Sequence, residues 1–134
     1  MKIEYDEEKD MLPIQVNVEA IPKSIVISQS EPKRCFYNSY VVAKENSNIE
    51  IIEGVGIIIS KDNSAKAFPH VWNRVDDKYF DVTVNDSIDL SKNIVELKYL
   101  KVKSYLVSDF KDGDNLGFGV ETENFVKDIN NNIK

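Results

Sequence analysis

Residues 49–60 constrain the fold most, because they form a long apolar run rich in isoleucine. β-Branched residues favour strands, and Gly54 and Gly56, which interrupt the run, indicate a bulge or a close approach of two backbones. A polar turn follows at residues 61–64. The chain is therefore expected to build a sheet around this strand.

Further strands are predicted on both sides of this run. Residues 67–75 and 78–84 are two strands joined by Asp76-Asp77, and residues 95–107 are again β-branched and aromatic. Near the start of the chain, residues 14–19 alternate apolar and polar side chains, which is the strand period. Residues 25–27 form another short β-branched run, which is also predicted to be extended.

Helical spacing occurs in two places. In residues 35–45, Phe36, Tyr40 and Ala43 fall on one face. Residues 121–133 place Phe125, Ile129 and Ile133 on one face of a terminal helix. The predicted class is α+β, with an antiparallel sheet of at least four strands packed against the helix that carries Cys35. The start of this first helix has an alternative, in which Ser30 caps a helix that begins at Glu31.

Composition limits the possible classes of protein. A chain of 134 residues with 42% hydrophobic residues fits one domain, residues 1–134. A single cysteine and a single histidine exclude an internal disulfide and make a structural zinc site very unfavourable, so no metal or cofactor is expected. A net charge of -6 argues against nucleic acid as a partner. No signal peptide or membrane-length apolar run is visible, so a cytoplasmic, reducing location without membrane contact is expected.

Cys35 is the candidate nucleophile. It lies at the predicted helix start, where unpaired N–H groups and the helix dipole stabilise an anion and so favour a thiolate, and Lys33 and Arg34 add positive charge beside it. His70 is the sole histidine and therefore the candidate base. The backbone N–H of Cys35 and the side chain of Gln29 are candidate donors to an oxyanion.

Asp81 is the candidate partner that orients His70. If Asp76-Asp77 is a two-residue hairpin turn, Val75 pairs with Lys78, and His70 and Asp81 become diagonal neighbours on one face of the sheet. A three-residue turn would place them on opposite faces. Trp72 shares the face of His70, where it would shield the pair from water and border a substrate cleft, whereas Asn73 points the other way.

These segments resemble the transglutaminase-like branch of the papain-like cysteine enzymes. The resemblance covers residues 29–83 and rests on Cys35-Phe36-Tyr37-Asn38, Glu53-Gly54-Val55-Gly56, His70-Val71-Trp72-Asn73 and Lys78-Tyr79-Phe80-Asp81-Val82-Thr83. It implies a papain-like core with Cys35 as nucleophile, His70 as general base, Asp81 as orienting carboxylate and Gln29 as the oxyanion glutamine. Val82 stands where the family has proline.

The predicted function is thiol-dependent acyl transfer on an amide. A peptidase, amidase or deamidase would pass the acyl group to water, and a transglutaminase would pass it to an amine. The substrate would be a protein or peptide amide, and because the chain is short, a protein partner could complete the cleft. The alternative is a catalytically inactive papain-like-fold module that binds or inhibits another protein. A redox-sensing thiol ranks last, since there is no resolving cysteine.

Overall fold

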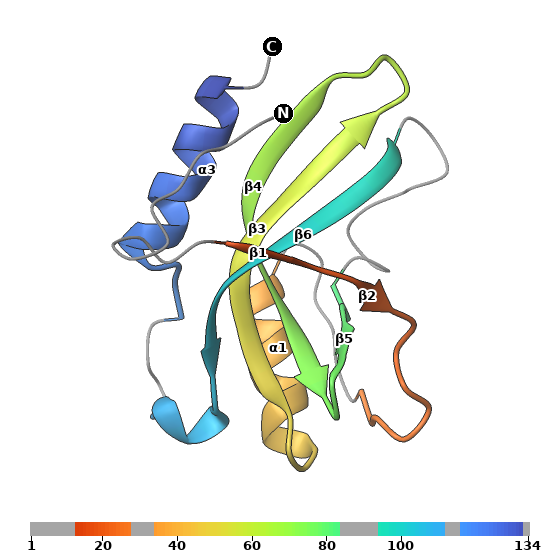
Figure 1. The fold of residues 1–134 in the computed structure, drawn as a ribbon. Helices are drawn as coiled ribbons and strands as arrows, with labels where there is room; N and C mark the ends of the chain where they lie inside the picture. The colour runs from red at the N-terminus through yellow and green to blue at the C-terminus, as the bar shows by residue number, and fades with distance from the viewer. Residues whose placement is uncertain (1–12, 28–33, 84–93, 112–115, 133–134) are drawn as a thin grey trace.

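The computed structural model describes residues 13–27, 34–83, 94–111 and 116–132. Within these ranges the fold is α+β, as predicted (Figure 1). A curled six-stranded sheet packs against two α-helices, α1 (Cys35–Glu45) and α3 (Val120–Asn132), and a short 3-10 helix, η1 (Val107–Asp109), follows the last strand. Helix α1 has the predicted bounds, and α3 begins one residue before the predicted position.

The sheet has the strand order β1-β6-β3-β4-β5-β2. The six strands are β1 (Ile14–Val16), β2 (Val18–Glu19), β3 (Glu50–Ser60), β4 (Ala65–Val75), β5 (Lys78–Phe80) and β6 (Ile94–Tyr105). The alternating segment near the chain start is thus divided between two strands, β1 and β2, which lie at opposite edges of the sheet although only Asn17 separates them.

The sheet is mixed, so the prediction of an antiparallel sheet was wrong at one edge. Strand β2 pairs in parallel with β5, whereas the other neighbouring strands are antiparallel. The parallel pair follows from the topology. Each antiparallel step from β1 through β6, β3 and β4 to β5 reverses direction, so β5 runs the same way as β1. Because β2 continues the direction of β1, it meets β5 in parallel.

The turn between β4 and β5 has the even length on which the predicted register depends. Asp76 and Asp77 both have positive φ, 47° and 67°, as the two central residues of a type I′ hairpin turn require. Aspartate tolerates this left-handed conformation better than most residues. Val75 consequently pairs with Lys78, as predicted, and Asn73 pairs with Phe80 at the end of β5.

Both faces of the sheet carry buried apolar side chains, because successive residues of a strand point to opposite faces. On one face α1 covers Ile51 and Val71. On the same face Ile129 of α3 packs in one cluster with Val55 of β3. On the other face Ile52, Trp72 and Tyr99 form a separate cluster with partly buried side chains of β1 and β2. The two faces therefore differ: one is covered by helices, and the other is enclosed by the curl of the sheet itself.

Hydrogen bonds to Glu53 connect the start of α3 to the helix-covered face of the sheet. The Glu53 side chain is fully buried and accepts hydrogen bonds from the Tyr105 hydroxyl at 3.0 Å, the Gly119 backbone N–H at 3.0 Å and the Thr122 hydroxyl. Burial, together with the nearby charge of Glu53, raises the pKa of Tyr105 to about 12, so this phenol stays a neutral donor. A buried carboxylate is stable only with such partners, and here two of them come from the first turn of α3 and the residue before it.

Residues 25–27, predicted to be extended, form no strand. The backbone of Val26 instead pairs with the side chain of Asn46 at the end of α1. Its N–H donates to Asn46 Oδ1 at 2.9 Å, and its carbonyl accepts from Asn46 Nδ2 at 2.8 Å. An asparagine side chain thus satisfies the groups that a neighbouring strand would otherwise pair, and residues 25–27 do not join the sheet.

Gly54 should tolerate no side chain. A Cβ at this position would lie 2.0 Å from the Leu100 carbonyl oxygen and 2.7 Å from the Trp72 ring. We expect Gly54→Ala to lower the free energy of unfolding by about 3 kcal/mol, because the clash involves backbone of the neighbouring strand. Urea unfolding monitored by Trp72 fluorescence measures this change.

Gly117→Ala is the matched control for this substitution. A Cβ at Gly117 meets nothing within 4 Å, so its stability should change by less than about 0.5 kcal/mol. Equal urea midpoints for the two variants would contradict the close approach of β3 and β6 at Gly54.

Candidate active site

Cys35 is the first residue of α1. Arg34 is the N-cap, with φ -115° and ψ 55°, and the first helical hydrogen bond runs from the Asn38 N–H to the Arg34 carbonyl at 2.8 Å. The alternative start at Glu31 is therefore wrong, since Arg34 is not helical. Cys35 is partly exposed, and its sulfur lies in the positive field of a helix N-terminus.

His70 and Asp81 form the hydrogen-bonded pair that the hairpin register predicts. His70 Nε2 lies 2.5 Å from Asp81 Oδ2, and the two residues are only 4% and 5% exposed. His70 belongs to β4, whereas Asp81 directly follows β5. The type I′ turn at residues 76–77 places both on the same face of the sheet, because an even loop length preserves the pairing on which the prediction rested.

His70 also interacts with Cys35. Burial by itself lowers the pKa of His70, but hydrogen bonds and charge interactions with Asp81 and Cys35 outweigh it and raise the pKa to about 9. Because Nε2 is bonded to Asp81, Nδ1 is the ring nitrogen left for the thiol. The Asp81 carboxylate and the Cys35 thiol therefore both favour the protonated imidazole of His70.

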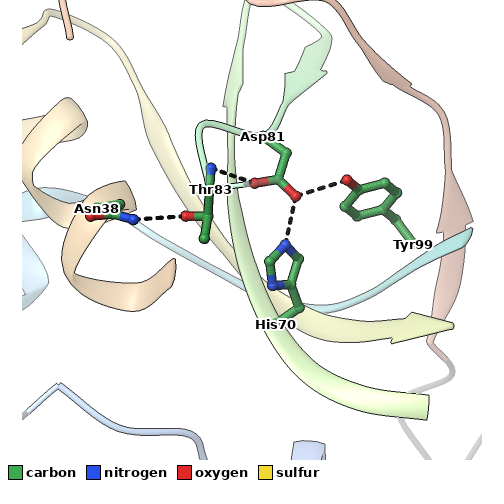
Figure 2. A network of polar contacts seen from close by, with 5 residues as sticks. All are labelled: Asn38, His70, Asp81, Thr83 and Tyr99. Atoms are coloured by element: carbon green, nitrogen blue, oxygen red, sulfur yellow. Dashed lines mark hydrogen bonds and ion pairs between the residues drawn. The ribbon is translucent and has the colours of Figure 1, made fainter. Parts of the chain in front are cut away.

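Asp81 remains a carboxylate in this buried position. Burial raises its pKa, but the hydrogen bond and charge of His70, followed by donors from Tyr99 and Thr83, bring it below the ordinary value. The Tyr99 hydroxyl donates to Oδ2 at 2.7 Å and the Thr83 N–H donates to Oδ1 at 2.9 Å (Figure 2). Each carboxylate oxygen thus has at least one partner.

The segment after β5 joins this pair to α1. Asn38, one helical turn after Cys35, donates from Nδ2 to Thr83 Oγ1 at 3.0 Å (Figure 2). Because the β4–β5 pairing ends at Asn73 and Phe80, residues 81–83 are no longer paired with β4. This segment can therefore contact the helix that carries the thiol, and its contact with Asn38 helps to hold the thiol and the His70–Asp81 pair in one place.

Aromatic side chains enclose the imidazole. Trp72 stacks on His70 with ring centroids 5.9 Å apart and an interplanar angle of 26°, and Phe68 and Tyr99 pack against the same ring. Trp72 is fully buried. It is placed to shield the pair from water, as predicted, but it has no exposed surface with which to border a substrate cleft.

The remaining candidates lie elsewhere. Asn73 points to the other face, as predicted, and donates to the Ser39 carbonyl at 3.0 Å and to the Glu50 carbonyl at 3.3 Å, so it does not orient His70. The guanidinium of Arg34 lies 4.3 Å from the ring centre of Tyr37. Gln29, the candidate oxyanion donor, and Lys33 lie outside the described residues.

Sequence reasoning missed the contributions of Tyr99 and Thr83. Tyr99 is far from Asp81 in the chain, and its approach depends on the pairing of β6 with β3, which includes a register shift between Glu53 and Gly54. No local pattern reveals such a shift. Thr83 could have been found, because a threonine two residues after an aspartate commonly donates its N–H to that carboxylate in an Asx-type turn.

Comparisons with protein-family models, curated proteins and solved structures found no match to this chain. In the described ranges, no helix is long and apolar enough to cross a membrane. Among the same residues, no group of three or more His, Cys, Asp or Glu side chains could hold a metal ion. The geometry around Cys35, His70 and Asp81 is therefore the feature that bears on function.

Proposed function

We propose that the protein transfers acyl groups from amides through a Cys35 thioester, on a papain-like core of the transglutaminase-like type. The observation that carries this proposal is the position of His70, which is hydrogen-bonded to Asp81 and whose pKa is raised by both Asp81 and Cys35. A nucleophile, a base and a group that orients the base are what thiol-dependent acyl transfer needs. Their order in the chain supports the same family.

The proposed reaction begins when the Cys35 thiol gives its proton to His70 and the resulting thiolate attacks the amide carbonyl carbon. A C–S bond forms and the carbonyl oxygen becomes an oxyanion. When the C–N bond breaks, protonated His70 gives its proton to the leaving amine, and a thioester remains on Cys35. Neutral His70 then takes a proton from the acceptor, whose attack on the thioester breaks the C–S bond and restores the starting state.

The surroundings support each of these roles. The Cys35 backbone N–H, unpaired at the helix start, is a natural donor to the oxyanion, and Gln29 is proposed as a second donor. Asp81 keeps the imidazole oriented and stabilises its protonated form. A reducing compartment such as the cytoplasm would keep the thiol in its active form. The proposed substrates are protein or peptide amides, with a partner protein completing the cleft.

Acylation by a generic donor tests the proposal without knowledge of the natural substrate. On incubation with p-nitrophenyl acetate, the protein should gain one acetyl group on Cys35, seen by intact mass and peptide mapping. The acetyl group should then be lost by transfer to water or to an added primary amine. Faster loss with the amine would favour a transferase, and equal loss a hydrolase.

A negative result would favour the alternative function. If folded protein gains no acetyl group on Cys35 above the level of unfolded protein, the proposal fails. The papain-like-fold module that binds or inhibits another protein would then be the better account.

A further inference from the structure

The carboxylate of Asp81 has a second strong donor besides His70. Asp81 Oδ2 accepts hydrogen bonds from His70 Nε2 at 2.5 Å and from the Tyr99 hydroxyl at 2.7 Å, so two donors share one oxygen (Figure 2). The other oxygen, Oδ1, accepts a hydrogen bond from the Thr83 N–H at 2.9 Å. These contacts restrict the position of the carboxylate beside the imidazole. Tyr99 is 6% exposed, so water has little access to replace its hydroxyl.

We propose that Tyr99 is a positioning residue for the candidate active site, acting through Asp81 to hold His70 in its productive orientation. This inference rests on the proposed acyl transfer. The hydroxyl donates to Asp81, while the ring packs against the imidazole at 5.9 Å and edge-on against Trp72 at 5.0 Å between centroids. The two parts of the side chain therefore act on both members of the pair.

The electrostatics around the carboxylate agree with this role. Burial and the charge of Asp81 raise the pKa of Tyr99, so the phenol remains a neutral donor over the working pH range. The groups that act on Asp81 include His70 from β4, Tyr99 from β6 and the Thr83 N–H. Loss of the Tyr99 donor should move the pKa of Asp81 upward, because a hydrogen bond to the charged form favours that form.

Tyr99→Phe isolates the hydroxyl, since the ring contacts remain. With p-nitrophenyl acetate as donor, we expect the maximal acylation rate of Cys35 to fall about 10- to 100-fold, the range for a lost hydrogen bond to a charged group. The donor concentration at half-maximal rate should stay unchanged. The acid limb of the pH–rate profile should move to higher pH, because Asp81 is protonated earlier.

Tyr105→Phe is the matched control. It also removes a partly buried hydroxyl from a carboxylate, here Glu53 at 3.0 Å, which lies on the face of the sheet opposite to His70. Both variants should lose stability, whereas only Tyr99→Phe should shift the acid limb and the maximal rate. If both variants keep the wild-type profile, or both change it equally, Tyr99 has only a structural role. If the wild-type protein itself is not acylated, the proposed function fails instead.

A measurement on the unmodified protein covers the case in which Tyr99→Phe does not fold. Two protons that are hydrogen-bonded to the same carboxylate oxygen, here Asp81 Oδ2, lie close together. The Tyr99 hydroxyl proton should therefore be protected from exchange and show a nuclear Overhauser effect to the Nε2 proton of His70. A rapidly exchanging hydroxyl without this effect would overturn the proposal.

Discussion

Replacing Asp81 by asparagine should lower the pKa of His70 from about 9 to near or below its ordinary value of 6.5. Burial disfavours the imidazolium, and the partner that mainly offsets this cost is Asp81. His70 is the sole histidine, so a ¹H–¹³C NMR titration of its ring gives one unambiguous curve. Asp81→Asn should also lower the free energy of unfolding at pH 7 by about 3 kcal/mol, as breaking a buried ion pair does.

The pH dependence of stability gives the same prediction a second readout. Because the folded-state pKa of His70 is raised, its contribution is complete below pH 6.5 and is lost as the pH rises through about 9. The pKa of Asp81 is lowered from 3.8, so its contribution is present above that pH and is lost as the pH falls through the lowered value. Wild type and Asp81→Asn should therefore differ most between pH 3.8 and 6.5.

Asp76→Asn is the matched control for this experiment. It makes the same chemical change in the same hairpin, on an exposed residue whose positive φ asparagine also tolerates. Its His70 titration and stability curve should match those of the wild type. If Asp81→Asn leaves the His70 titration unchanged as well, the buried pair does not exist in solution.

Replacing Cys35 by alanine should abolish acyl transfer while leaving the protein folded. Removal of a nucleophile lowers the rate of comparable enzymes by roughly 10⁴-fold or more. Cys35 is partly exposed at the helix start, so the loss of stability should stay below about 1 kcal/mol. The pKa of His70 should fall as well, because the hydrogen bond and charge interaction with Cys35 help to raise it.

Cys35→Ser separates two effects of the thiol: its reactivity as a nucleophile and its influence on the pKa of His70. Serine keeps a side chain that can hydrogen-bond to His70, so His70 should titrate at higher pH than in Cys35→Ala, but acylation should remain absent or very slow. Acetyl incorporation from p-nitrophenyl acetate, followed by intact mass, measures the first effect, and the His70 titration measures the second. Undiminished acylation of Cys35→Ala would place the nucleophile at another residue.

Local patterns were sufficient for the elements that build the candidate site. Periodicity located α1, and of the two starts considered the structure has the one at Cys35. Of the two turn lengths considered for Asp76-Asp77, the structure has the even one, which brings His70 to Asp81. These features depend on residues close together in the chain, so turn chemistry and side-chain period decide them.

Contacts between distant segments could not be predicted in this way. The approach of Tyr99 to Asp81 depends on a register shift in the pairing of β6 with β3, and the parallel pairing of β2 with β5 depends on how far the sheet curls. Val26 lies outside the sheet because a side chain of α1, Asn46, takes its backbone bonds. In each case tertiary packing decides between conformations that the local sequence allows equally.

The rate of Cys35 acetylation in folded protein, compared with the same protein unfolded in urea at pH 7, tests the central claim most directly. The chain has one cysteine, so every thioester reports that residue. If Cys35, His70 and Asp81 act together, the folded protein should react at least about 100-fold faster, the lower range for general acid–base assistance, and His70→Ala should remove this advantage. Equal rates in the folded and unfolded protein would contradict the account.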